Sequence, residues 1–292
     1  MTSNTSQLLD PPVNRAAYSD RSAWIMASCS ALAYVQFEKG ESVKQQLCAS
    51  LKELRLELLT PFQREATRGF VATNQHYAVL AFRGTEENLD NIRTDINIRF
   101  YRDSSGAKIA TGFRQAYALV ENQVTDAISE IGSDLPLYIT GHSLGGALAA
   151  IASARVRPSD RVAACYTFGC PRVGDTEFAE QLWKVPVYRL VHASDIVPRL
   201  PFAFGYRHAG DLRYIKRSGK LIESPNSVGT FLAFAFTFAT GGKKVFENHR
   251  IAEYASNLQT WALTRFELEK DPTSTQGPPS PKTLAAFTGA AH

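Results

Sequence analysis

The sequence predicts an α/β fold, in which a mostly parallel central sheet is covered by helices on both faces. Short apolar stretches typical of buried strands alternate along the chain with longer stretches whose apolar residues recur every three or four positions. The 292 residues are 44% hydrophobic, which is enough to build one substantial core. A glycine-flanked serine at 141–145 also stands where a strand is expected to turn into a helix.

The N-terminal part of the chain predicts two helices followed by two strands. Apolar residues at spacings of three, four and seven indicate helices over 21–37 and 42–59, and Ser19 is placed to cap the first of them. The pattern then changes to alternating or continuous apolar residues, which predicts strands over 70–74 and 76–82.

The remainder of the chain continues the alternation of strands and helices. Helices are expected over 113–131 and 144–156, and strands over 137–140, 162–168 and 187–192. Strands separated by helices pair in parallel, and the ligands of such sheets bind at the carboxyl ends of the strands.

Composition divides the chain into one domain and two terminal segments. We expect an N-terminal extension over 1–19, a single domain over 20–268, and a flexible tail over 269–292 that is rich in Pro, Ser and Thr. No repeat and no internal linker interrupts the domain.

Charge and hydropathy exclude several classes of function. The 32 Lys and Arg against 28 Asp and Glu give a net charge of +4 from scattered residues, which gives no support to nucleic-acid binding. The longest apolar run, 231–239, is too short for a transmembrane segment. The first residues lack the features of a secretory signal, which predicts a cytoplasmic or leader-independent secreted protein. Four cysteines are expected in helices or strands as free thiols: Cys29, Cys48, Cys165 and Cys170.

The motif Gly-x-Ser-x-Gly at 141–145 predicts a nucleophile. A sharp strand-to-helix turn forces Ser143 into a strained backbone conformation, and the flanking glycines let neighbouring chain segments pass close by. The following helix begins at Leu144, whose backbone N–H is a natural donor to an oxyanion.

A serine nucleophile needs a base, and the base needs an acid to orient it. His142 lies in the turn itself, so its side chain should point away from the serine hydroxyl. Of the six histidines, His208 and His249 remain as candidate bases, because the others precede the serine, crowd the acid or lie in the tail. Asp175 and Asp195 each follow a later strand. Both acids and both bases satisfy the expected chain order, so the pattern alone leaves two acids and two bases open.

Four motifs occur together in one order: FRGT at 82–85, TGHSLGGALA at 140–149, TFGCPRVGD at 167–175 and SDIVPRLP at 194–201. With these motifs the chain resembles the class 3 lipase family, the fungal-type triacylglycerol lipases and their bacterial relatives, from about residue 20 to about residue 262. The resemblance implies an α/β-hydrolase fold.

The resemblance also implies a catalytic triad of Ser143 as nucleophile, Asp195 as acid and His249 as base, ahead of a short helix that ends near Tyr254. His208 matches a His-Ala-Gly stretch of the family that does not supply the base.

The resemblance places the oxyanion hole at Thr85 and Leu144, with Asp95 supporting the Thr85 hydroxyl. Residues 86–98 occupy the position of the family's lid, which covers the acyl groove and opens at a lipid interface. The segment has few apolar residues and fits a modest lid over short or medium acyl esters. Residues 227–239 form either a buried helix or a wall of the acyl pocket or an interfacial patch.

The implied activity is hydrolysis of acylglycerol or similar fatty-acyl esters through an acyl-enzyme, with no metal and no organic cofactor. The expected partners are a lipid or ester substrate and a peripheral lipid interface. A phospholipase, an aromatic-ester esterase and a non-catalytic lipid-binding protein stay open as alternatives on the same fold.

Overall fold

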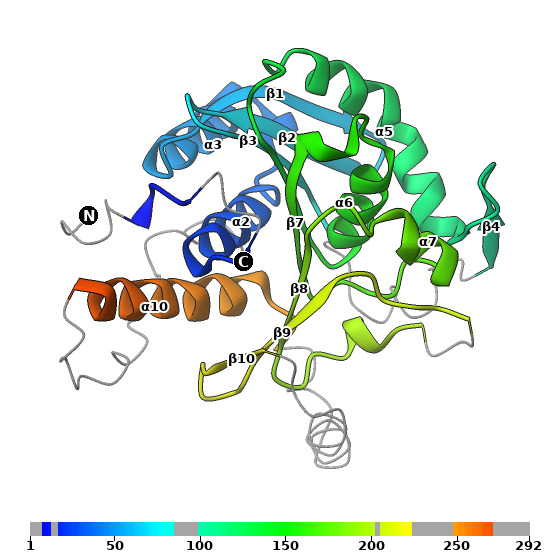
Figure 1. Ribbon diagram of the computed structural model, residues 1–292. Coiled ribbons are helices and arrows are strands. Elements are labelled where there is room, and N and C mark those ends of the chain that lie inside the picture. The colour runs from blue at the N-terminus through cyan, green and yellow to red at the C-terminus, as the bar shows by residue number, and fades with distance from the viewer. Residues whose placement is uncertain (1–7, 13–16, 85–98, 202–204, 224–247, 271–292) are drawn as a thin grey trace.

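The computed structural model describes residues 8–12, 17–84, 99–201, 205–223 and 248–270 (Figure 1). The helices in these ranges include α2 (Asp20–Leu32), α3 (Glu41–Glu53), α5 (Thr111–Ser129), α6 (Leu144–Arg155), α7 (Thr176–Gln181) and α10 (Ile251–Lys270). The strands are β1 (Glu57–Arg64), β2 (Thr67–Thr73), β3 (Ala78–Phe82), β4 (Phe100–Arg102), β5 (Lys108–Ala110), β6 (Leu137–His142), β7 (Val162–Phe168), β8 (Val187–His192), β9 (Asp211–Ile215) and β10 (Leu221–Glu223).

Eight of these strands form one sheet, in the order β1-β2-β3-β6-β7-β8-β9-β10. Strands β3, β6, β7, β8 and β9 pair in parallel, whereas β1, β2 and β10 add antiparallel edges. The remaining strands, β4 and β5, form a separate hairpin. The predicted mostly parallel sheet is therefore confirmed.

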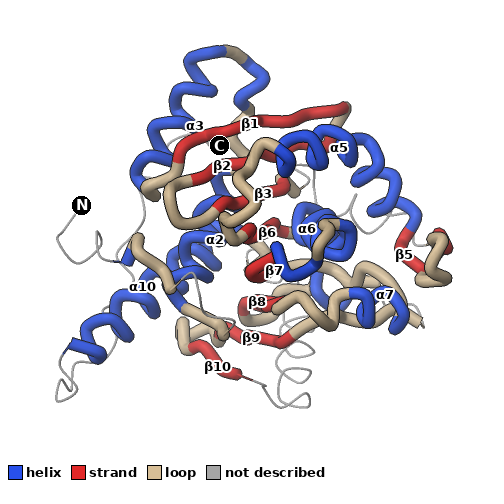
Figure 2. Tube along the Cα trace, turned by 45° about the horizontal axis from the view of Figure 1, so that its top comes forward, coloured by secondary structure: helices blue, strands red, loops and turns tan. Residues whose placement is uncertain are grey.

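Helices cover both faces of the sheet, with α2, α3 and α10 on one face and α5, α6 and α7 on the other (Figure 2). Every residue of β6 is buried as a result, and its first three residues, Leu137 to Ile139, are apolar without the alternation of a half-exposed strand. Helix α6 is rich in Gly, Ala and Ser and is buried on nearly every side. Small side chains let it pack closely on β6 and β7.

The structure corrects the second predicted helix. It ends at Glu53 rather than at residue 59, and residues 57–64 form strand β1 along the antiparallel edge. Apolar residues continue at helical spacing past residue 53, but Arg55 has a positive φ of 57°, which ends the helix. Residues 57–64 then pair with β2 instead of continuing the helix.

The last helix is also longer than expected. The resemblance implied a short helix ending near Tyr254, but α10 runs on to Lys270 and passes the domain boundary predicted at residue 268. Its core-facing residues explain the length: Tyr254, Leu258 and Ala262 recur every four positions, and all three are buried.

The cysteines are free, as expected, with Cys29, Cys165 and Cys170 buried and Cys48 half-buried. Cys170 lies in the loop after β7, not in a helix or strand, so that part of the expectation is wrong. Within the described ranges, no helix is long and apolar enough to cross a membrane.

Candidate active site

Ser143 occupies the turn between β6 and α6 in a strained backbone conformation. Its φ is 57° and its ψ is −126°, a combination that costs a non-glycine residue about 1–3 kcal/mol. The side chain is buried, and Ser143 stands directly before the first residue of α6. This geometry presents the hydroxyl at the carboxyl end of β6, as the Gly-x-Ser-x-Gly motif predicted.

The flanking glycines make the turn possible because the chain passes too close for any side chain. A Cβ atom at Gly141 would lie 2.1 Å from the carbonyl oxygen of Gly145, and one at Gly145 would lie 2.3 Å from the carbonyl oxygen of Phe82. Leu144 begins α6, and the amide of a helix's first residue has no acceptor within the helix. That amide is therefore free of the helix's own hydrogen bonds, as the predicted oxyanion donor requires.

The structure brings Asp195 and His249 into direct contact from distant parts of the chain. Asp195 lies just beyond the end of β8, and His249 lies just before α10. The two Asp195 carboxylate oxygens lie 2.8 and 3.0 Å from Nδ1 of His249. Both side chains are buried, so the ion pair that forms when the imidazole is protonated is shielded from water.

Two further groups hold the carboxylate of Asp195. The backbone N–H of Val197 donates to Oδ1 at 2.9 Å, and the hydroxyl of Tyr254 donates to Oδ2 at 2.6 Å. Burial and the carboxylate raise the pKa of Tyr254 well above its ordinary value, so the hydroxyl stays protonated. The carboxylate therefore has a fixed orientation toward the imidazole.

Gly169 provides the space in which the Asp195–His249 pair lies. It follows β7 with a φ of 56°, and a Cβ atom there would lie 2.7 Å from Oδ2 of Asp195 and 2.8 Å from Nδ1 of His249. Any side chain at this position would push the two apart.

Two polar atoms of the site have no hydrogen-bond partner among the described residues. Oγ of Ser143 and Nε2 of His249 are both buried and unpaired. A buried polar atom without a partner is costly, and such atoms mark sites where a substrate or a reacting group completes the bonding. Oγ of Ser143 and Nε2 of His249 are therefore both available to a bound group.

The structure separates the alternative acid and base from this cluster. Asp175 caps α7 by accepting a hydrogen bond from the backbone N–H of Phe178 and accepts another from that of Lys108. His208 donates through Nε2 to the carbonyl oxygen of Pro198 at 2.7 Å. Burial lowers the pKa of His208 to about 3, so it stays neutral. Both residues therefore have structural roles.

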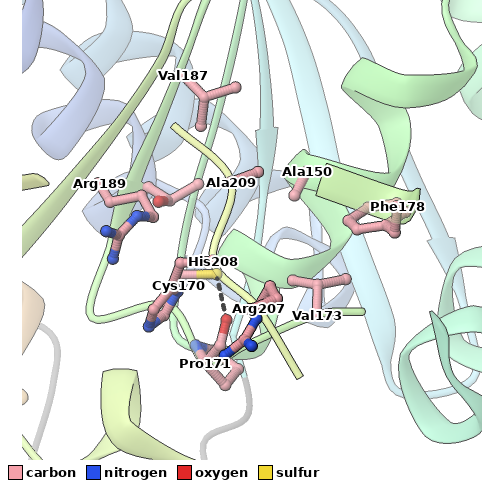
Figure 3. Close-up of a pocket in the computed structure, with 11 residues that line it drawn as sticks. Ala150, Cys170, Pro171, Val173, Phe178, Val187, Arg189, Arg207, His208 and Ala209 are labelled. Carbon is pink, nitrogen blue, oxygen red and sulfur yellow. Dashed lines mark hydrogen bonds between the residues drawn. The ribbon is translucent and has the colours of Figure 1, made fainter. Parts of the chain in front are cut away.

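His208 also lines a small cavity on the α6 and α7 side of the sheet, shown in Figure 3. The cavity measures about 20 Å³, room for roughly one water molecule. Its walls combine apolar residues with the polar residues Thr167, Arg189, Arg207 and His208, and Cys170 points its Sγ toward the carbonyl oxygen of Pro171. It is too small for an acyl chain and contains none of the predicted triad residues.

Several predicted features lie outside the described residues. These are Thr85 and Asp95 of the oxyanion hole, the lid at 86–98 and the segment 227–239. Sequence reasoning in turn predicted no supporting role for Tyr34, His192 or Tyr254. Tyr254 bonds to Asp195 directly, whereas Tyr34 bonds to His142 and His192 bonds to the residue before His249. None belongs to a recognisable motif, although Tyr254 lies five residues after His249, close enough to have been considered.

A strained serine at the end of a central strand, with an aspartate from the end of β8 in contact with a histidine from the segment before α10, defines the α/β-hydrolase class. The family model of lipase (class 3) matches residues 79–205. The lipase of Rhizopus microsporus var. chinensis has 31% sequence identity and a TM-score of 0.58, over 69% of this chain and 76% of its own. Lipase II from Rhizopus niveus has 30% identity and a TM-score of 0.59, over 68% and 80%. The chain belongs to the class 3 lipase family.

Curated relatives match over shorter stretches. A lipase of Rhizopus niveus is 37% identical over 165 residues, 51% of this chain and 42% of the relative. Secreted mono- and diacylglycerol lipase 1 of Fusarium solani is 40% identical over 110 residues, 36% of this chain and 33% of the relative. The matches therefore span about two fifths or less of the length of these relatives.

Proposed function

We propose that this protein hydrolyses fatty-acyl esters of the acylglycerol type through a serine-bound acyl intermediate. The observation that carries the proposal is the buried contact between Asp195 and His249, with Nε2 of His249 and Oγ of Ser143 left unpaired in the same site. The similarity to proteins named lipase and mono- and diacylglycerol lipase supports acylglycerols as the substrate class.

In the proposed reaction, Ser143 attacks the ester carbonyl while His249 takes its proton at Nε2. Asp195 stabilises the resulting imidazolium. The tetrahedral intermediate carries its negative charge on the former carbonyl oxygen, toward which the amide of Leu144 and the amide and hydroxyl of Thr85 donate. His249 then protonates the departing alcohol, and water repeats the sequence to release the carboxylic acid. No step calls on a metal or an organic cofactor.

Chain-length profiling with p-nitrophenyl esters from acetate to palmitate tests this function. Wild-type protein should hydrolyse part of the series, and Ser143→Ala should hydrolyse none while keeping its fold. The position of the maximum then separates a preference for short acyl chains from one for long chains. A folded wild-type protein without activity on any ester or acylglycerol would contradict the proposal.

A substitution at Thr85 tests the oxyanion hole separately. We propose that Thr85 donates to the oxyanion and that Asp95 supports its hydroxyl. Thr85→Val keeps the shape of the side chain and removes the hydroxyl, so kcat should fall roughly 10²-fold with little change in KM. An unchanged kcat would remove the hydroxyl from the mechanism.

We also propose a peripheral contact with lipid surfaces, supported by three exposed aromatic side chains. Phe100, Tyr101 and Trp183 are 37%, 43% and 78% exposed. Aromatic rings flanked by cations are typical of residues at membrane–water interfaces. Each ring here has a cation 5.2–5.8 Å from its centroid: Lys108 for Phe100, Arg114 for Tyr101 and Lys184 for Trp183.

The hairpin β4–β5 carries the first two rings and bridges through Ile109 to Gly174, which also bridges to Arg207. Helix α7 lies beside this hairpin (Figure 1) and bonds to its turn through Gln181. Co-sedimentation should show stronger binding to vesicles containing phosphatidylglycerol than to pure phosphatidylcholine, weakened by Trp183→Ala. Equal recovery with and without vesicles would contradict the contact.

A further inference from the structure

The base stands on a segment that is neither helix nor strand, so its position depends on tertiary contacts. Asn248 and His249 precede α10, and each has a buried backbone whose carbonyl oxygen needs a donor. Both carbonyls are held by buried histidines of the central sheet. Nε2 of His142, at the end of β6, lies 2.6 Å from the carbonyl oxygen of His249. Nδ1 of His192, at the end of β8, lies 3.2 Å from that of Asn248.

The contacts of His142 define its tautomer. A carbonyl oxygen only accepts hydrogen bonds, so Nε2 of His142 must carry the proton. Nδ1 is then an acceptor, and the hydroxyl of Tyr34 lies 2.7 Å from it as the donor. The chain of contacts runs in one direction, from the Tyr34 hydroxyl through the imidazole to the backbone of the base.

The ring of His142 also lies against the ring of the base. The two imidazole centroids are 4.5 Å apart with an interplanar angle of 35°. Burial, followed by the charge of His249, lowers the pKa of His142 well below its ordinary value. His142 therefore stays neutral, and no second cation opposes His249 when that residue takes the serine proton.

We propose that His142 is a positioning residue for the base: its Nε2–H holds the backbone carbonyl of His249, and Tyr34 fixes the tautomer that makes this possible. The residue between glycine and serine in the Gly-x-Ser-x-Gly motif thus acts on the third member of the triad rather than on the serine beside it. The inference rests on the proposed ester hydrolysis only for its kinetic readout.

Two substitutions at His142 separate the two nitrogen positions. In His142→Gln the side-chain amide reaches the place of Nε2 and keeps a donor toward the His249 carbonyl. In His142→Asn the shorter side chain reaches the place of Nδ1, keeping a partner for Tyr34 but leaving that carbonyl without one. We expect kcat to fall by roughly tenfold in the Gln variant, about the cost of one altered hydrogen bond. In the Asn variant it should fall by about 10²-fold, because a small misplacement of a catalytic group is that costly. KM should stay within about twofold in both.

Tyr34→Phe tests the tautomer without removing any carbon atom, so folding is not at risk. Losing one neutral hydrogen bond should lower kcat by roughly three- to tenfold and move the acidic limb of the profile of kcat/KM against pH, with KM unchanged. Tyr117→Phe is the matched control, because this tyrosine is buried on α5 against Phe82 and contacts none of the triad. Its kcat and pH profile should match the wild type.

A readout independent of turnover separates this inference from the proposed function. The proton between Nδ1 of His249 and Asp195 should give a downfield proton resonance with no substrate present. It should broaden or shift in His142→Asn and in Tyr34→Phe, and stay closer to the wild-type position in His142→Gln. Equal effects of Gln and Asn, or a Tyr34→Phe protein with wild-type kcat, pH profile and resonance, would overturn the inference. If the wild type hydrolysed no ester but the variants still showed these resonance shifts, only the proposed function would be refuted.

Discussion

Removing the hydroxyl of Tyr254 should weaken both the stability and the turnover of the protein. The hydroxyl donates to Oδ2 of Asp195 at 2.6 Å and accepts from the backbone N–H of His192 at 3.0 Å. Tyr254→Phe deletes only this oxygen, because the ring stays packed among Phe168, His142 and His192. The effect therefore reports hydrogen bonds rather than a cavity.

The magnitude follows from the two bonds. A hydrogen bond to a charged group contributes about 1.5–3 kcal/mol, and a buried N–H left without an acceptor costs about 1–3 kcal/mol. Because Phe is more apolar than Tyr, part of this is offset, and we expect a loss of about 3 kcal/mol in the free energy of unfolding. At this chain size Tm should fall by roughly 6–12 °C. Asp195 keeps its contacts with His249 and with Val197, so kcat should fall about tenfold rather than vanish.

Thermal unfolding followed by circular dichroism, with ester turnover measured on the same preparations, gives both numbers. Tyr117→Phe again serves as the control, since its hydroxyl lies outside the site. A Tm within about 2 °C of the wild type together with unchanged kcat would refute the reasoning, because it would mean that Asp195 is oriented without Tyr254.

Three further outcomes follow from the geometry. Ser143→Gly should abolish turnover. It should nevertheless be about 1 kcal/mol more stable than Ser143→Ala, because relief of the strained φ of 57° outweighs the extra chain entropy of glycine. Equal Tm values of the two variants in calorimetry would contradict this. Gly145→Ala should leave little folded protein, since the new Cβ would lie 2.3 Å from a backbone oxygen of β3, whereas Gly132→Ala meets nothing within 4 Å and should express normally. Because the pKa of His208 is about 3 in the folded state and about 6.5 when unfolded, the unfolded chain binds the extra proton between these values and stability falls as the pH drops through them. In His208→Gln, the slope of the free energy of unfolding against pH, measured by denaturant titration, should decrease by one proton. This variant should keep its turnover at pH 8, unlike His249→Gln. An unchanged slope would argue against a neutral buried His208.

Local patterns predicted the parts of the fold that depend on local sequence. Strands β7 and β8 have the bounds expected from their apolar runs, and the turn at Ser143 has the strain that its glycines imply. The edge strands β1 and β10 were missed because a strand with one exposed side lacks a continuous apolar run. The end of the helix at Glu53 was missed because the helical spacing of apolar residues continues beyond it.

Local sequence patterns could not identify which aspartate and which histidine form the Asp–His pair. Asp175 and Asp195 both follow strands, and His208 and His249 both follow them in order, so spacing alone left four combinations. The choice in the structure depends on which loops meet at the end of β7, and this is a property of sheet order rather than of any segment. Resemblance to a family supplied the choice that local pattern lacked. The supporting groups carry no pattern of their own: Tyr34 lies in the turn after α2, and Tyr254 lies in α10 near the other end of the described chain.

The packing of α10 against α2 has a consequence for the synthesis of the protein. These helices stand near the two ends of the described chain and are joined on the same face of the sheet, with Nε of Arg265 3.0 Å from Oδ2 of Asp20. Helix α2 leaves the ribosome early, but the surface that covers its apolar side is translated more than two hundred residues later. His249 arrives with that same late segment. In the proposed mechanism, a nascent chain therefore contains Ser143 long before His249, and it should gain ester hydrolysis only after the segment that carries α10 has been made.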